Sequence, residues 1–147
     1  MDILGSTFRI AARALRAERM RLDVVASNLA NANTTQTPEG GPYRRKGVVF
    51  TTKEFANDMG PVDASLGAAG RPSGVDVSEI TYDDDPPRLV YEPGHPDADP
   101  QGYVAYPNVN PVLEMVDLQA ATRAYEANVQ VVNATRQLSN AALSIIG

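Results

Sequence analysis

The sequence contains no cysteine, no tryptophan and only one histidine among its 147 residues. Without cysteine, the chain can form no disulfide bond and can offer no thiolate as a nucleophile or metal ligand. The single histidine, His95, sits between glycine and proline in a turn, so nothing indicates a catalytic triad or a metal site built from several histidines. Adjacent acids such as Asp83 and Asp84 are more typical of a solvated turn than of acid–base catalysis. We therefore expect no catalytic residue, no cofactor and no bound metal.

Long apolar runs are also missing. No run approaches the roughly 20 residues that a membrane-spanning helix needs, so we expect no membrane insertion. The first five residues lack the basic and apolar regions of a secretory signal, so any export would use a route that reads another feature. Residues 61–110 carry nine acidic residues against two arginines. This charge does not suit a nucleic-acid partner, which binds to basic surfaces.

Proline and glycine are scarce at both ends of the chain. All eleven prolines lie between residues 38 and 111, and nine of the eleven glycines lie between residues 40 and 102. Because these residues interrupt helices and form turns, the sequence predicts an α+β protein with a helix at each end and an irregular middle. We predict that the two helices pair as a coiled-coil-like hairpin and form one discontinuous domain. An extended segment and a small β module are inserted between them.

The C-terminal helix, predicted for residues 110–147, carries two apolar stripes. Asn110 suits the N-cap, and Pro111 suits the first helical position. One stripe follows an unbroken heptad pattern through Ala120, Ala124, Ala127, Val131, Ala134, Leu138, Ala141 and Ile145. A second, patchier stripe runs beside it through Leu118, Ala121, Tyr125, Val132, Ala142 and Ile146. We expect the first stripe to pair within the chain and the second to face other chains, because a helix of about 50 Å exceeds what a domain of this size needs.

The N-terminal helix, predicted for residues 1–33, carries a matching stripe. Its members step by four and three residues through Leu4, Phe8, Ala11, Leu15, Glu18, Leu22, Val25 and Leu29. Another face brings together Arg9, Arg13 and Arg16, either as a contact for acidic surfaces of neighbouring subunits or as a solvated face. Because the stripes are rich in alanine and bury little area per residue, an isolated hairpin would be marginal. We expect further copies or homologues to supply the missing burial, and the terminal helices of the free chain to be frayed.

The middle of the chain divides into an extended segment with a hairpin, residues 34–62, and a small β module with loops, residues 63–109. Asparagine, threonine, proline and glycine end the first helix near Asn33. Residues 54–74 are expected to form a mobile loop. With few strands, the module has little core of its own and should lean on a helix or a neighbour. Short strands are predicted at residues 44–51, 75–82, 89–91 and 103–106.

One turn has the spacing of a Ca²⁺-binding loop. Asp97, Asp99 and Gly102 occupy the first, third and sixth positions of such a loop. However, Asn108 stands where the final bidentate glutamate belongs, and no helices flank the turn. The alternative is a proline- and glycine-rich turn held by aspartate side chains.

Two segments resemble a known protein family. The segment LDVVASNLANANT at residues 22–34 is similar to the N-terminal signature of bacterial flagellar axial proteins, which include rod, hook and hook–filament junction subunits. The segment TPEGGPYRRK at residues 37–46 and the runs PGHPDAD and GYV within residues 93–104 resemble the proximal rod subunits of that family. Other axial subunits usually have a tighter Thr-Pro-Gly-Tyr at this point, whereas this chain has the longer Glu-Gly-Gly-Pro form.

The resemblance implies a structural subunit of the flagellar basal body. Its terminal helices would pack with those of neighbours into a tube around the export channel, and the rod would carry torque across the periplasm from the MS ring towards the hook. The implied partners are copies of itself, other proximal and distal rod subunits, and the MS-ring or export-gate end of the rod. The implied export route is the flagellar type III apparatus. The residues expected at subunit interfaces are Leu15, Leu22, Val25, Asn28, Leu29, Asn31, Asn33, Tyr43, Arg44, Arg45, Leu118, Tyr125, Ala127, Val131, Val132, Ala134 and Leu138.

The heptads alone would also allow a non-flagellar coiled-coil binding module, such as a chaperone or adaptor. That alternative predicts a defined soluble oligomer that tolerates changes between Asn31 and Tyr43. A rod subunit instead predicts loss of assembly when Asn31 or Tyr43 is altered, while the chain itself stays stable. For Arg44, Arg45 and Lys46 we expect acidic neighbours rather than solvent.

Overall fold

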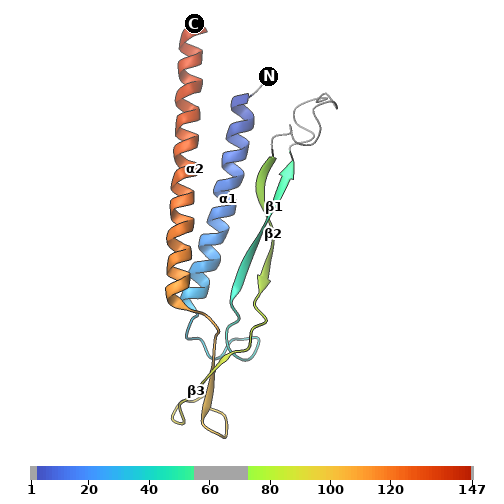
Figure 1. The fold of residues 1–147 in the computed structure, drawn as a ribbon, viewed down its shortest axis with the longest axis vertical. Helices are drawn as coiled ribbons and strands as arrows, with labels where there is room; N and C mark the ends of the chain where they lie inside the picture. The colour runs from blue at the N-terminus through green and yellow to red at the C-terminus, as the bar shows by residue number, and fades with distance from the viewer. Residues whose placement is uncertain (1–2, 55–72, 147) are drawn as a thin grey trace.

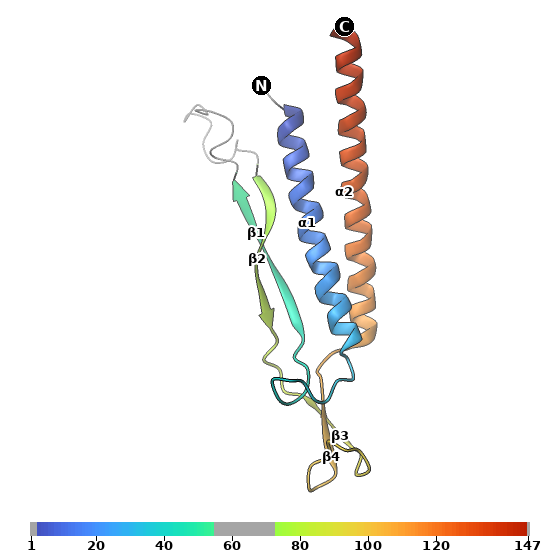
Figure 2. The same ribbon diagram turned by 180° about the vertical axis from the view of Figure 1, so that it is seen from behind.

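The computed structural model describes residues 3–54 and 73–146 as an elongated α+β chain, which confirms the predicted class (Figure 1). The two long helices run antiparallel as a hairpin, and strands occupy the chain between them (Figures 1 and 2). In chain order the elements are α1 Ile3–Ala30, β1 Lys46–Glu54, β2 Ser73–Tyr82, β3 Arg88–Tyr91, β4 Tyr103–Tyr106 and α2 Pro111–Ile146.

Both helices have local signals at their inner ends. The side-chain oxygen of Asn110 accepts hydrogen bonds from the N–H groups of Val112 and Leu113 at 3.0 and 3.4 Å, which confirms Asn110 as the N-cap of α2. Helix α1 ends at Ala30, slightly before the predicted end. There the side-chain amide of Asn31 donates to a backbone carbonyl of the last helical turn at 2.8 Å, a local bond that favours a turn over further helix.

Helix α1 forms the central layer of the molecule. Helix α2 lies along one side of it and the β1–β2 hairpin along the other (Figures 1 and 2). Ala11 and Val25, from the predicted heptad stripe, are 4% and 5% exposed. Ala17 and Val24 lie outside that stripe and are just as deeply buried, at 3% and 7%. Within the chain it is therefore α1, rather than α2, that packs against more than one neighbour.

Strands β1 and β2 form an antiparallel hairpin. The pairing runs from Lys46 opposite Tyr82 to Glu54 opposite Ser73, with an irregularity in register part of the way along. Glu54, Ser73 and Gly74 therefore belong to strands, although they were predicted to lie in a mobile loop. The rest of that predicted loop, residues 55–72, lies outside the described residues. The predicted boundary between residues 62 and 63 also lies outside the described residues.

Strands β3 and β4 form a second hairpin. It projects from the end of the molecule where α1 ends and α2 begins, which we call the foot (Figures 1 and 2). We call residues 88–106 the tip hairpin. Its turn closes with a hydrogen bond from the Glu92 N–H to the Gly102 carbonyl at 2.8 Å. Gly102 has φ +87°, and a Cβ there would lie 2.9 Å from the Tyr91 ring, so this position requires glycine. The Tyr106 hydroxyl donates to the Glu92 carboxylate at 3.0 Å, and this bond, together with burial, raises the pKa of Tyr106.

The acids with Ca²⁺-loop spacing form hydrogen bonds within the foot of the molecule. The Asp99 carboxylate accepts from the N–H groups of Gln101 and Tyr103 at 2.9 and 2.8 Å. The Asp97 carboxylate accepts from the Thr35 hydroxyl at 2.7 Å. These bonds match the alternative of a turn held by aspartate side chains.

Candidate subunit interface

A buried polar cluster joins the helical hairpin to the β1–β2 hairpin. We call it the polar junction. It comprises Asn28 near the end of α1, Glu114 in the first turn of α2, and Tyr43, Arg45 and Lys46 at the entrance of β1. Asn28 and Glu114 are only 0% and 1% exposed, although both are polar. Buried polar groups destabilise a fold unless they are hydrogen-bonded, so the hydrogen-bond partners determine whether this cluster stabilises the chain.

Asn28 uses its entire hydrogen-bonding capacity. Its side-chain nitrogen donates to the Lys46 carbonyl at 2.8 Å and to the Glu114 carboxylate at 3.1 Å. Its side-chain oxygen accepts from the Tyr43 hydroxyl at 3.0 Å and from the Lys46 N–H at 2.9 Å. An asparagine side chain has two donors and two acceptor lone pairs, and all of them are used. One side chain therefore fixes the end of α1 to the start of α2 and to the start of β1.

Ion pairs extend the polar junction along the helices. The Arg45 guanidinium donates from Nε to the Glu114 carboxylate at 2.7 Å, and this charge-assisted bond reaches a carboxylate that water does not. Asp117, one turn further along α2, lies 3.9 Å from Arg45 and 3.6 Å from Arg21 of α1. The two helices and the β1 entrance are thus held by a connected set of charges.

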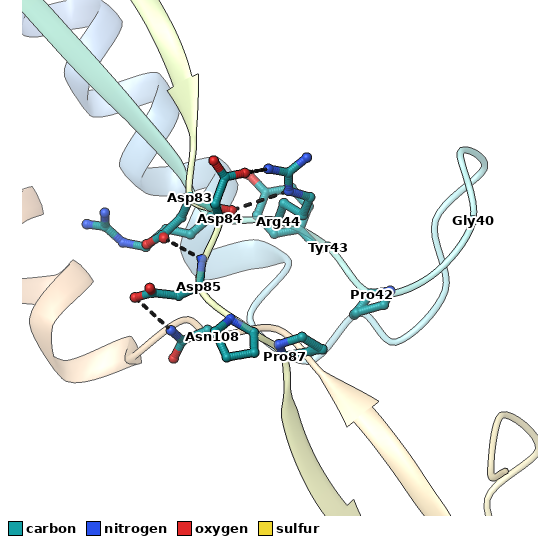
Figure 3. A pocket seen from close by; sticks show the side chains of 11 residues that line it. Gly40, Pro42, Tyr43, Arg44, Asp83, Asp84, Asp85, Pro87 and Asn108 are labelled. Carbon is teal, nitrogen blue, oxygen red and sulfur yellow. Dashed lines mark hydrogen bonds and ion pairs between the residues drawn. The ribbon is translucent and has the colours of Figure 1, made fainter.

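A cleft of about 390 Å³ lies beside the junction and is lined partly by Asp83, Asp84 and Asp85 (Figure 3). Arg44 forms an ion pair with Asp84, and the Asp83 carboxylate accepts from the Asp85 N–H at 3.0 Å. Asp85 approaches the Asn108 side chain at 3.5 Å. The acids therefore brace the connection between β2 and β3. Arg44 thus has an acidic partner in its own chain, as Arg45 has in the polar junction. That acids of other subunits also meet these arginines stays a prediction.

The segment from Asn31 to Tyr43 folds back onto its own chain. The Thr34 hydroxyl donates to the Asn31 side chain at 3.2 Å, and the Tyr43 N–H donates to the Thr34 carbonyl at 3.0 Å. Tyr43 is 9% exposed and bonds to the fully buried Asn28. Gly40 and Gly41, both with positive φ, form an exposed turn between these anchors. The burial of Tyr43 argues against the expectation that its alteration would leave the chain stable, and that expectation stays a prediction to be tested.

The stripe of α2 that faces α1 is not the one predicted to pair within the chain. The stripe that faces α1, here the inner stripe, consists of Glu114, Leu118, Ala121, Tyr125, Asn128, Val132, Thr135 and Ser139. Every one of these residues is buried or half-buried, and Ala121 and Thr135 are 0% and 5% exposed. The outer stripe consists of Ala120, Ala124, Ala127, Val131, Ala134, Leu138 and Ala141, all exposed except the half-buried Ala124.

Local hydrogen bonds explain why the more polar stripe is the buried one. The Asn128 side chain donates to the Ala124 carbonyl at 3.0 Å, and the Thr135 hydroxyl donates to the Val131 carbonyl at 2.8 Å. Each of these side chains thereby donates a hydrogen bond to its own helix, which lowers the cost of placing it against α1. Judging the stripes by apolarity alone therefore selected the wrong face for the intramolecular contact.

The residues predicted at subunit interfaces fall into three groups by burial. Val25, Asn28 and Tyr43 are buried within the chain. The half-buried group is Leu15, Leu22, Leu29, Asn31, Arg45, Leu118, Tyr125 and Val132. The exposed group is Asn33, Arg44, Ala127, Val131, Ala134 and Leu138. Glu114 was not predicted as a buried residue, because charged residues usually lie at the surface. The exposed apolar residues Val112, Leu113, Met115 and Val116 were not predicted at an interface either.

Within residues 3–54 and 73–146, no three histidine, aspartate or glutamate side chains are grouped so as to hold a metal ion. None of the helices in these ranges is long and apolar enough to cross a membrane.

Comparisons with known proteins give a consistent result. Residues 8–36 match the family model described as flagella basal body rod protein, and residues 101–145 match the model described as flagellar basal body rod FlgEFG protein C-terminal. The chain is 42% identical to the flagellar basal-body rod protein FlgC of Borreliella burgdorferi over 97% of both chains. It is 47% identical to FlgC of Bacillus subtilis over 95% of both chains, and 46% identical to FlgC of Escherichia coli over 92% of both.

Proposed function

The chain belongs to the FlgC family of flagellar basal-body rod proteins, and we propose that it packs against neighbouring rod subunits through the outer stripe of α2. It is a structural subunit of the rod, it is located in the flagellar basal body, and it assembles with other rod components. The observation that carries the proposal is the exposure of an unbroken apolar heptad stripe over most of a long helix.

The composition of the outer stripe suits helix-to-helix packing. Val131 and Leu138 are 46% and 64% exposed. Contiguous apolar surface of this kind usually marks a site of contact with another protein. The alanines between them let a second helix approach closely, although each buries little area. Stability then comes from many small contacts summed along the helix, as expected where each subunit touches several others.

The polar junction suits a subunit that carries mechanical load. We propose that it keeps the helical hairpin and the β1–β2 hairpin at a fixed orientation, so that torque applied to one is passed to the other. A fully hydrogen-bonded side chain such as Asn28 resists rotation, because any change of angle breaks buried bonds that water cannot replace.

We propose further that the partners are copies of this chain, other proximal and distal rod subunits and the MS-ring or export-gate end of the rod. Delivery would use the flagellar type III apparatus. A strain that lacks type III export but keeps its general secretion machinery tests this route: the chain should then stay in the cytoplasm, and its appearance in the periplasm would contradict the proposal.

The assembly surface is tested by substitution on one residue of the outer stripe. Ala134→Glu places a charge in the stripe, and we expect the chain to remain folded but to be absent from isolated basal bodies, with loss of swimming. Asn133→Glu is the matched control, because Asn133 is also exposed but lies outside the stripe. Circular dichroism of the purified chains checks folding. Normal incorporation of the Ala134 variant would contradict the proposal.

A further inference from the structure

The tip hairpin has one uncovered apolar face. Tyr91 pairs with Tyr103 and Leu89 with Ala105 across the two strands, so their side chains lie on the same face. Leu89, Tyr91 and Tyr103 are 64%, 63% and 43% exposed. The two tyrosine rings pack edge to face with centroids 5.3 Å apart. Both tyrosines of this aromatic pair are thus open to solvent.

The opposite face of the tip hairpin is partly covered by the chain itself. Val104 is 0% exposed, and Tyr106 bonds to Glu92 and meets the His95 ring edge to face. A two-stranded hairpin of this size has little stability of its own in water. Covering its apolar face would therefore both bury unfavourable surface and order the hairpin.

A second uncovered apolar cluster lies at the same end of the molecule. Val112, Leu113, Met115 and Val116, here the foot cluster, are 64%, 61%, 45% and 58% exposed. At 100° per residue they cover the side of α2 opposite Glu114, which points into the polar junction. Val116 and Leu113 precede Ala120 by four and seven residues, so the cluster continues the outer stripe towards the start of the helix.

We propose that the apolar face of the tip hairpin of one copy packs on the foot cluster of an adjacent copy in the rod. The proposal rests on the proposed function. The two clusters lie near the same end of the chain, and both are uncovered within it (Figures 1 and 2). They are different patches, so the contact joins unlike surfaces, which is the kind of contact that builds rings and helical tubes.

The size of the contact indicates when it forms. Seven side chains bury far less than the roughly 800 Å² per partner of a stable complex, so the contact would not hold two free chains together. It would form beside the helix contact of the outer stripe, with which the foot cluster is continuous. One copy would then touch its neighbour at two places, which fixes the angle between them.

Cysteine cross-linking tests this contact, since the chain has no cysteine of its own. Two differently tagged chains, Leu89→Cys and Val116→Cys, are co-expressed in place of the wild type, and isolated basal bodies are oxidised. We expect disulfide-linked pairs that carry both tags. Leu89→Cys with Thr122→Cys, an exposed position on α2 outside the foot cluster, is the control and should give none.

Several results would overturn the contact. They are cross-links only between two Leu89→Cys chains, equal cross-linking in the control, or no cross-link in basal bodies that contain both chains. A second measurement needs only one variant: maleimide labelling of Leu89→Cys should fall several-fold between the free chain and the basal body, and equal labelling would contradict the proposal. Absence of the tagged wild-type chain from basal bodies would instead overturn the proposed function.

Discussion

The polar junction is buried and rich in charge, whereas the outer stripe of α2 is exposed and apolar. Asn28 and Glu114 are inaccessible to water, while Leu138 is 64% exposed. A self-sufficient domain would show the reverse, because apolar burial is the main force that stabilises it. Both regions lie on or against the same helix, so the contrast does not arise from different local folds.

The contrast indicates a division of labour within the chain. Hydrogen bonds are directional, so a buried polar cluster fixes angles between elements better than apolar packing does. Apolar packing is not directional, but covering apolar surface is always favourable. It therefore suits a surface that becomes buried only when neighbouring subunits bind. Buried polar groups therefore fix the geometry within the chain, and exposed apolar groups are available for assembly. Three substitutions test this contrast and a fourth tests the cap of α2. They are ordered by their expected effect on the free energy of unfolding, and two of them have control variants.

Glu114→Leu should destabilise the free chain most. The change keeps the volume roughly constant but removes an acceptor of Asn28 and the charged partner of Arg45. We expect a loss of about 3 kcal/mol, near the lower limit for breaking a buried ion pair, because Arg45 is one-third exposed and can turn to water. Urea denaturation followed by circular dichroism measures it.

Asp117→Leu serves as the control for Glu114. It lies one turn further along α2 and takes part in the longer ion pairs, but its side chain is 42% exposed. Its loss should change the free energy of unfolding by less than about 1 kcal/mol. Equal effects for the two variants would show that burial does not distinguish the junction.

Tyr43→Phe should have the next largest effect. It removes the hydroxyl that donates to Asn28 at 3.0 Å and leaves the ring in place. The Asn28 oxygen keeps only the Lys46 N–H, so we expect a loss of about 1–2 kcal/mol. The denaturation midpoint should fall while the slope of the transition stays the same. An unchanged midpoint would mean that the hydroxyl bond contributes nothing to the fold.

Much of this arrangement is readable from the sequence. Periodicity and the absence of proline and glycine predict both long helices, and Asn110 with Pro111 predicts the start of α2 within one residue. The short strands at residues 89–91 and 103–106 are also found in β3 and β4. These features depend on local preferences, which a single sequence records directly.

The roles of the α2 stripes are not readable in the same way. To choose between the two stripes one must know that the Asn128 and Thr135 side chains donate hydrogen bonds to carbonyls of α2 itself. One must also know that Asn28 donates a hydrogen bond to Glu114, 86 residues away in the sequence. Such pairings are long-range and polar, whereas heptad analysis scores only local apolarity. The sequence therefore identified surfaces suited to contact but not which of them the chain keeps for itself.

Asn110→Ala should have a smaller effect than the junction variants. The Asn110 side chain caps two N–H groups at the start of α2, but it is exposed, so water can replace it in part. We expect a loss of about 1 kcal/mol, typical of an N-cap. Asn110→Ser should retain most of the stability, and equal losses for Ala and Ser would contradict a capping role.

Leu138→Glu should have the smallest effect on folding and separates the two regions most clearly. Leu138 is 64% exposed on the outer stripe, so the free energy of unfolding should change by no more than about 0.5 kcal/mol. The same change places a charge where neighbouring helices would pack, so incorporation into basal bodies should be lost. Denaturation of the purified chain and immunoblotting of basal bodies measure the two effects separately. A large loss of stability would mean that the outer stripe already contributes to the fold of the single chain, whereas normal incorporation would mean that no neighbour covers it.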